Sequence, residues 1–374
     1  MSRSRSISSL RLSHFRNYST AALDLDPRPV VLTGPNGAGK TNLMEAISLL
    51  SPGRGLRRAP FENLKQNGSD APWGVAASIE TWQGPVDLGT GEVANESGRR
   101  ARINGANART IEALADYVRI LWLTPAMDGL FAGAPAERRR FLDRLVLALF
   151  PGHSRHLSDF EKAMRQRNRL LSDSAEPAWF DATEVQMAEL GSAIHFARLD
   201  SLGKLQHLAL SGLDGDDFPA AVLRLDPGFV SSGTMHASTD LEAAFVAMWR
   251  DARDADRAAG RTLAGPHRAD LEVIHAQKQM PAALCSTGEQ KALLVGLVLA
   301  HARVVAETAG IAPLLLLDEI AAHLDPHRRA RLFAILLGLE GQCFMTGTDA
   351  MLFEAFGTGA QHFEVDGGRV TLTA

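Results

Sequence analysis

The segment Gly34-Pro-Asn-Gly-Ala-Gly-Lys40-Thr41 decides the fold, because it joins a short apolar run to a stretch with helical periodicity. The run Val30-Val31-Leu32 precedes it and is typical of a buried strand, whereas residues 41–50 have apolar side chains at helical spacing until Pro52-Gly53. Glycines let backbone amides converge on phosphate groups, and a helix N-terminus adds a favourable dipole. The segment therefore predicts a phosphate-binding loop (P-loop) in an α/β domain.

The residues at the end of this loop have the chemistry that a nucleotide needs. We expect Lys40 to hold the β- and γ-phosphates as a point charge and the Thr41 hydroxyl to bind Mg²⁺. ATP and Mg²⁺ are therefore the predicted cofactors. The other predicted nucleotide contacts in this region are Gly34, Asn36, Gly37, Gly39 and Asn42.

An acidic pair follows a second apolar run. Leu314–Leu317 is long enough for a central strand, and Asp318-Glu319 stands at its carboxyl end, where ligands bind in parallel sheets. We expect Asp318 to bind magnesium, directly or through water, and Glu319 to orient and deprotonate the attacking water. The alternative is a solvated acidic helix cap.

The motif Ser286-Thr-Gly288-Glu-Gln290 opens a helix-like run ahead of that strand. By itself, a serine at a helix start is usually just an N-cap. In this position, however, the motif resembles the signature motif of ABC-type ATPases, which contacts the γ-phosphate bound by the opposite subunit. The resemblance implies that Ser286, Gly288 and Gln290 reach the nucleotide of a second copy, and that Asp325 takes the place of the D-loop aspartate.

The bulk composition limits the function less than the motifs do. The 374 residues suggest two or three domains, and 45% hydrophobic with 22% charged residues is ordinary for a soluble globular protein. The net charge of −4 does not by itself indicate nucleic-acid binding. A DNA-binding prediction must therefore rest on local basic clusters.

The N-terminus and the cysteines give no sign of export. The stretch Met1-Ser-Arg-Ser-Arg lacks the apolar segment of a signal peptide, and apolar runs such as residues 292–300 fall short of a membrane span. Cys285 and Cys343 lie in apolar surroundings without metal-ligand spacing, so we expect buried thiols. We expect a cytoplasmic, nucleoid-associated protein that has no membrane contact.

The two ends of the chain are expected to form one α/β lobe around a helical middle. The predicted domains are residues 1–115 with 300–374 for an ATPase lobe, and 116–299 for a largely helical lobe that carries the signature motif. No heptad register persists, which excludes a long coiled coil. The helices predicted in the middle are residues 136–150, 156–171 and 185–210.

Longer motifs make the chain similar to the RecF family, which is related to the ATPase heads of SMC proteins. The resemblance covers nearly the whole length, and its later motifs are far more specific than the P-loop. The residues that carry it are 15–18, 34–47, 53–57, 102–105, 133–143, 165–168 and 265–271.

This resemblance implies a two-lobed ABC-type ATPase head, ATP-dependent homodimerisation, and binding to duplex DNA, gapped DNA or single/double-strand junctions. It also implies a partnership with RecR, and the loading of recombinase onto single-stranded gaps during recombinational repair and replication-fork maintenance. Hydrolysis is expected to be slow and stimulated by DNA. By the same match, Arg16 lies in the N-terminal element that approaches the nucleotide.

The sequence departs from the family pattern at three places in the expected site. Glu319 stands where the family often has aspartate, which is closer to the general ABC form. Leu121, ahead of Thr124-Pro125, replaces the glutamine that some relatives use as a magnesium contact. The switch histidine of ABC transporters is missing near Thr346, where a threonine is expected to substitute for it.

Clusters of arginine provide candidate phosphate contacts, since the guanidinium fork matches phosphate oxygens and needs no base readout. The alternative for any one cluster is a solvated face or an ion pair within the molecule. The candidate DNA contacts are Arg54, Arg57, Arg58, Arg99, Arg100, Arg102, Arg138, Arg139, Arg165 and Arg167.

Two other functions share the same core motifs. A transporter nucleotide-binding subunit usually has its signature motif much closer to the P-loop than Ser286 is to Gly34. A nucleotide-switched scaffold, whose main ligand is a protein rather than DNA, would also keep Lys40, Asp318 and Glu319. The first is disfavoured by this spacing, and the second stays open.

Overall fold

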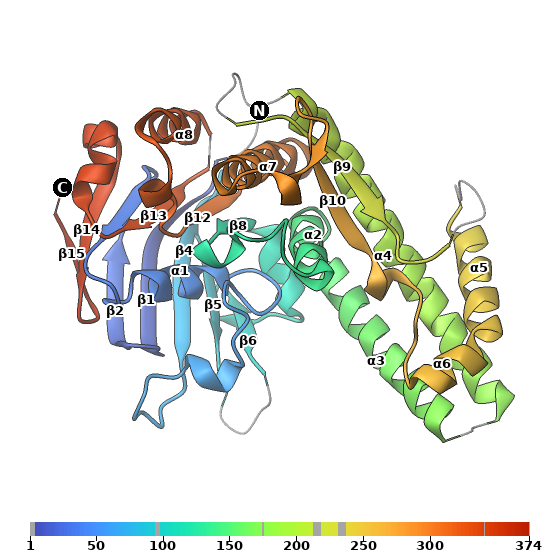
Figure 1. Cartoon of the computed structure of the whole chain (residues 1–374). Coiled ribbons are helices and arrows are strands. Elements are labelled where there is room, and N and C mark those ends of the chain that lie inside the picture. Colours follow the sequence, from blue (N-terminus) through green and yellow to red (C-terminus); the bar gives the residue numbers. More distant parts are fainter. Residues whose placement is uncertain are drawn as a thin grey trace. The chain divides into compact units, whose positions relative to one another are not determined.

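The structure, a computed structural model, describes residues 4–93, 98–173, 176–211, 218–230, 237–339 and 341–373. It forms two compact units (Figure 1). Unit 1 comprises Met1–Asp128, Ser211–Ala220 and Ser286–Ala374, and unit 2 comprises Gly129–Leu210 and Ala221–Cys285. These limits differ from the predicted domains, since residues 116–128, 211–220 and 286–299 belong to unit 1. The predicted signature motif therefore lies in unit 1 and not in the helical lobe.

Unit 1 contains a mixed sheet that carries the predicted strands. Its strand order is β15-β14-β3-β13-β12-β8, and all neighbours are parallel except the β14–β15 pair. The central strands are almost entirely apolar and buried, as expected for parallel strands covered on both faces. The strands are β3 (Val30–Thr33), β8 (Ile120–Leu123), β12 (Leu314–Leu317), β13 (Cys343–Gly347), β14 (Gln361–Asp366) and β15 (Arg369–Leu372).

A second sheet of unit 1 is antiparallel throughout, with the order β2-β1-β4-β5-β6-β7. Its strands alternate buried and exposed residues, which shows that the sheet covers the core with one face. The strands are β1 (Ser6–Phe15), β2 (Tyr18–Asp24), β4 (Gly74–Glu80), β5 (Val86–Gly91), β6 (Arg100–Ile103) and β7 (Ala106–Asn107).

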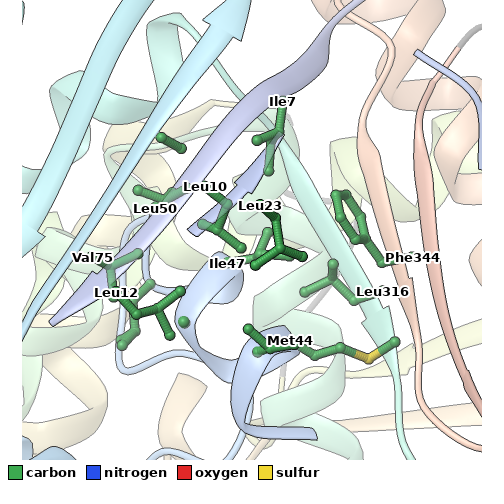
Figure 2. Close-up of a cluster of buried hydrophobic side chains, with 14 of the residues drawn as sticks. Ile7, Leu10, Leu12, Leu23, Met44, Ile47, Leu50, Val75, Leu316 and Phe344 are labelled. Carbon is green, nitrogen blue, oxygen red and sulfur yellow. The ribbon is translucent and has the colours of Figure 1, made fainter. Parts of the chain in front are cut away.

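One apolar cluster joins the two sheets to a helix. It contains Ile7 and Leu10 of β1, Ile47 of the helix after the P-loop, Leu316 of β12 and Phe344 of β13, all essentially excluded from solvent (Figure 2). Because the P-loop helix takes part in this core, the position of the loop is fixed by the packing of unit 1.

The helices of unit 1 are α1 (Lys40–Ser48), α7 (Thr287–Ala309) and α8 (Pro326–Gly338). Among the described residues, α7 is long and apolar enough to cross a membrane by length and composition, but 72% of its most apolar window is buried inside the protein. It contacts β8, which explains why it belongs to unit 1. Its apolarity is that of a core helix.

Short 3-10 helices connect the elements of unit 1. They are η1 (Phe61–Leu64), η2 (Ile111–Asp116), η3 (Pro125–Met127), η6 (Ile320–His323) and η7 (Ala350–Gly359).

Unit 2 is largely helical, and its predicted helices are confirmed within a few residues at most ends, although the third begins earlier, at Pro177. The described residues include no helix longer than α4, which has 35 residues, so the absence of a long coiled coil is confirmed for them. The helices are α2 (Pro135–Leu149), α3 (His153–Ser172), α4 (Pro177–Ser211), α5 (Ser238–Asp251), α6 (Arg253–Ala259), η4 (Pro266–Arg268) and η5 (Ala282–Leu284).

A small antiparallel sheet, with the order β11-β10-β9, completes unit 2. Its strands are β9 (Ala221–Asp226), β10 (Asp270–His275) and β11 (Met280–Pro281). The separate core of this unit includes Phe160, Phe245 and Trp249, and the ring centroids of Phe245 and Trp249 are 4.9 Å apart in a stacked arrangement.

Cys285 and Cys343 are buried free thiols, as expected, and burial raises the pKa of Cys343 to about 12.

Candidate nucleotide site

The P-loop runs from the end of β3 to the start of α1, and two of its glycines leave no room for a side chain. Gly34 has φ +144°, and a Cβ there would collide with the carbonyl oxygen of Val365. Gly39 has φ +118°, and a Cβ there would lie 2.6 Å from Asn17 Nδ2 and from Tyr18 Oη. Both backbones adopt a conformation that only glycine takes without strain.

The turn between β1 and β2 holds the loop from outside. The Asn17 side-chain amide donates to the Ala38 carbonyl at 3.0 Å, and the Tyr18 hydroxyl donates to the Gly39 carbonyl at 3.1 Å. The Asn42 amide donates to Asn17 Oδ1 at 2.7 Å, which ties the start of α1 to the same turn. These bonds fix the loop shape before any ligand binds.

Lys40 is buried, and its ammonium points into the loop. Nζ donates to the carbonyl oxygens of Gly34 at 2.7 Å and of Pro35 at 2.9 Å. Burial lowers the pKa of Lys40, and the negative charges of Glu319 and Asp318 act in the opposite direction. The charges of two acidic residues therefore reach this side chain.

The structure brings Thr41 and Asp318 into direct contact, although they come from opposite ends of the chain. The Thr41 hydroxyl lies 3.0 Å from Asp318 Oδ1 and 3.1 Å from Oδ2. The reason is the sheet topology, because the carboxyl ends of β3 and β12 face the same edge with β13 between them.

These two residues fit the predicted magnesium ion. A hydroxyl and a carboxylate are hard oxygen donors, and Mg²⁺ usually takes only one or two carboxylates from the protein, with waters and phosphates completing its shell. The described residues contain no group of three or more His, Cys, Asp or Glu side chains that could hold a metal on their own. The oxygen pair Thr41–Asp318 therefore suits Mg²⁺ that arrives with a nucleotide.

Glu319 follows Asp318 and adopts an unusual backbone conformation, with φ +51°. Its amide donates to the Thr346 hydroxyl at 2.9 Å, and its side chain is half-buried. Its negative charge acts to raise the pKa of Lys40 against the larger effect of burial. A carboxylate in this place can accept a proton from water next to a bound phosphate.

Two of the predicted contacts to a second subunit, Ser286 and Asp325, are helix caps in this chain. Ser286 and Glu289 form a reciprocal capping box at the start of α7, with Ser286 N donating to Glu289 Oε2 at 3.0 Å. Gly288 has open space around it, and Gln290 is buried. Asp325 caps α8 through the amides of His327 and Arg328, which lowers the pKa of its carboxyl.

Two arginines near the P-loop share a carboxylate that the sequence did not single out. Glu45 of α1 is 1% exposed and accepts from Arg16 Nε at 2.8 Å and from Arg57 Nη1 at 2.8 Å. Arg57 also donates to Asn42 Oδ1 at 2.6 Å. The sequence could have indicated this pairing through Glu45, because a carboxylate on the buried face of a predicted helix requires a cationic partner.

The structure removes some residues from the candidate DNA contacts. Arg167 is completely buried between Glu184 and Asp256, so its prediction as a DNA contact is wrong. Arg99 donates to the backbone carbonyls of Leu49, Ser51 and Gly53, and burial lowers its pKa to about 10. Its guanidinium therefore holds the chain after α1.

Two further arginines hold β10 rather than projecting freely. Arg138 pairs with Asp270 at 2.6 Å, and Arg139 donates to the Ala269 carbonyl at 2.9 Å. Burial lowers the pKa of Arg139. The candidates with exposed side chains are Arg54, Arg57, Arg58, Arg100, Arg102 and Arg165.

Two of the departures from the family pattern have clear structural positions. Leu121 is buried in β8 opposite Leu315 of β12, so this position carries only an apolar side chain. Thr346 is fully buried and donates to Asp318 Oδ1 at 2.7 Å. The sequence singled out this region only as the place where a threonine is expected to substitute for the switch histidine, without indicating the contact with Asp318.

Comparisons with known proteins show the family to which the chain is similar. The family model described as RecF/RecN/SMC N terminal domain matches residues 6–368. A Rhizobium etli protein named "DNA replication and repair protein RecF" is 56% identical over 368 residues, covering 98% of both chains. A protein of the same name from Agrobacterium fabrum is 55% identical over 373 residues, again covering 98% of both.

Solved structures show the same fold. A structure titled "Structure of the recombination mediator protein RecF-ATPrS in RecFOR pathway" has a TM-score of 0.88 and 21% identity, covering 100% of this chain and 99% of that one. The Smc head domain from Pyrococcus furiosus has a TM-score of 0.53 and 16% identity, covering 99% of this chain and 96% of that one. The predicted ABC-type ATPase head is thereby confirmed.

Proposed function

The chain belongs to the RecF family of ABC/SMC-type ATPases, and on this basis we propose that it is an ATP-dependent DNA-binding protein of recombinational repair and replication-fork maintenance. The relatives that it matches along their whole length are named for DNA replication and repair. The observation that carries the proposal is the contact of Thr41 with Asp318, whose charge acts on Lys40; this contact supports a site for Mg²⁺ and ATP.

Each residue of this site has a separate task in the proposed reaction. Lys40 would hold the β- and γ-phosphates, and Thr41 and Asp318 would hold Mg²⁺. The ion, when bound, supplies charge neutralisation on the phosphate oxygens. Glu319 would orient a water molecule and accept its proton as the water attacks the γ-phosphorus. Arg16 would approach the nucleotide while Glu45 fixes its guanidinium.

A second copy of the chain completes the proposed site. Ser286 and Gly288 of that copy would contact the γ-phosphate, with Gln290 and Asp325 beside them. The capping box supports this, because a helix N-terminus held in shape presents its free amides to an anion. ATP would thus join two copies into a clamp on duplex or gapped DNA, and slow, DNA-stimulated hydrolysis would release them.

The proposal includes partners and a compartment. The clamp would act in the cytoplasm on nucleoid DNA, bind RecR, and help load recombinase onto single-stranded gaps. The alternative, a nucleotide-switched scaffold whose main ligand is a protein, is favoured by one observation: Arg99, Arg138 and Arg167 have structural partners, which leaves fewer arginines for DNA.

Sedimentation velocity of Ser286→Arg tests the shared site. We expect this variant to bind ATP as a monomer and to lose ATP-dependent dimerisation, because the larger cation blocks docking but lies outside its own P-loop. Ser238→Arg, an exposed serine at the start of α5, is the matched control and should dimerise normally. Wild-type protein that stays monomeric in ATP, or a Ser286→Arg variant that loses ATP binding as well, would contradict the two-copy site.

A further inference from the structure

Thr346 occupies the carboxyl end of β13, between the strands that lead to the P-loop and to Asp318. Its side chain is completely buried, and its hydroxyl makes two hydrogen bonds. The hydroxyl oxygen lies 2.7 Å from Asp318 Oδ1 and 2.9 Å from the amide nitrogen of Glu319. One hydroxyl therefore contacts both acidic residues of the proposed reaction.

Chemistry fixes the direction of both bonds. An amide N–H can only donate, so the Thr346 oxygen accepts from Glu319. An ionised carboxylate can only accept, so the single hydroxyl proton of Thr346 goes to Asp318. Hydrogen bonds to an ionised group are the shorter and stronger ones, in agreement with the 2.7 Å distance to Asp318.

The bond to Asp318 orients its carboxylate. Thr346 contacts Oδ1, whereas the Thr41 hydroxyl lies within 3.1 Å of both carboxylate oxygens. Rotation of the carboxylate would break the Thr346 bond, so this bond fixes the orientation in which both oxygens face Thr41. The oxygens that would hold Mg²⁺ are thus fixed by a residue that is not itself a predicted ligand.

The bond to Glu319 acts on the backbone. Glu319 has φ +51°, a left-handed conformation that is unfavourable for residues other than glycine and persists only where the surroundings hold it. The Thr346 oxygen holds the amide of this residue at 2.9 Å. The backbone conformation sets the direction in which the Glu319 side chain leaves the chain.

We propose that Thr346 is a positioning residue for ATP hydrolysis, which sets Asp318 for Mg²⁺ and Glu319 for the attacking water through one hydroxyl. The inference rests on the proposed function, since it assigns a role within the same reaction. It differs from a packing role in that the hydroxyl, rather than the shape of the side chain, is required.

Three variants test the hydroxyl. Thr346→Val keeps the shape and removes the hydroxyl, and Thr346→Ser keeps the hydroxyl and removes the methyl group. Thr183→Val is the matched control, because Thr183 is also buried but its hydroxyl donates to the Trp179 carbonyl of α4. The measurements are kcat and KM for ATP, and the affinity for a fluorescent ATP analogue with and without Mg²⁺.

We expect Thr346→Val to lower kcat at least about tenfold, as loss of one transition-state contact does, while KM stays within about threefold. The gain in analogue affinity on adding Mg²⁺ should shrink in this variant. Thr346→Ser and Thr183→Val should behave like the wild type in both measurements. A purely structural role would instead lower the thermal midpoint without separating kcat from KM.

The inference is overturned if Thr346→Val keeps wild-type kcat and Mg²⁺ response, or if Thr346→Ser loses as much as Thr346→Val. Should Thr346→Val fail to fold, Thr346→Cys decides, since a thiol is a weaker donor and acceptor. Its kcat must then lie below that of Thr346→Ser. If the wild type shows no Lys40-dependent hydrolysis, the proposed function fails, and the Mg²⁺ effect on analogue affinity still tests Thr346 separately.

Discussion

At the scale of single residues, Arg167 shows how a charged side chain can serve the fold alone. Its guanidinium donates to Glu184 of α4 at 2.9 Å, to Asp256 of α6 at 2.6 Å and to the Trp249 carbonyl at 2.8 Å. The three charged side chains of this group are essentially excluded from solvent. One arginine of α3 therefore holds three other helices of unit 2.

We predict that Arg167→Ala lowers the free energy of unfolding by about 3–5 kcal/mol, because it leaves the buried Asp256 without its cationic partner and the buried Glu184 paired with Arg253 alone. Arg165→Ala is the matched control on the same helix, where the side chain is 63% exposed and pairs with Glu161 at 3.8 Å. Its effect should stay within about 0.5 kcal/mol. Urea unfolding measures the free energy of unfolding of both variants. Equal losses would show that the buried ion pairs of Arg167 contribute no more to stability than the exposed pair of Arg165.

Residue type alone could not show which of these two arginines is buried and which is exposed. Side chains two positions apart on a helix point to different sides, because successive residues are about 100° apart around the axis. The cluster of Arg165, Arg167 and Arg169 therefore divides between solvent and core. Periodicity showed that the helix exists, whereas the partners Glu184 and Asp256 lie far along the chain and became visible only in the folded unit.

At the scale of elements, the helices and strands around the nucleotide site follow closely from local sequence. The capping box of α7 is readable as Ser286 followed three residues later by Glu289. The strands β3 and β12 are readable as short apolar runs that end at the P-loop and at Asp318. Local signals suffice here because capping and burial depend on near neighbours.

Two glycines of α4 give a prediction at this scale. A Cβ added at Gly203 would meet no other atom within 4 Å, whereas a Cβ at Gly191 would lie 3.2 Å from Phe245 and 3.3 Å from Pro266. We expect Gly203→Ala to stabilise the protein by about 0.5–1 kcal/mol, since alanine favours the helix. Gly191→Ala should destabilise it by about 1–3 kcal/mol through overpacking.

Thermal or urea unfolding of the two variants measures this difference, and each variant is the control for the other in the same helix. Stabilisation by both substitutions would mean that the aromatic core of unit 2 yields at Gly191. Destabilisation by both would mean that the low helix propensity of Gly203 does not reduce the stability of the protein.

At the scale of the whole molecule, the site depends on neighbours that local patterns do not reveal. Phe344 of β13 pairs in register with Val30 of β3, and Leu316 of β12 pairs with Phe344 on the other side. This order places Thr346 between the two halves of the site. The sequence predicted Lys40, Thr41, Asp318 and Glu319 by type, but the bridging hydroxyl required the sheet order.

Our main proposal is that ATP, held at Lys40, Thr41 and Asp318, switches the protein onto DNA. Its sharpest test is fluorescence anisotropy of a labelled gapped duplex, titrated with protein in ATP, in ADP and without nucleotide. Lys40→Arg is the control, since arginine keeps the charge but does not fit the phosphate loop.

We expect binding at least about tenfold tighter in ATP, a difference of about 1.4 kcal/mol, and loss of this difference in Lys40→Arg. Equal affinity in all three conditions, or no binding in any of them, would contradict the proposal. The ATP site would then have to act on a protein partner instead.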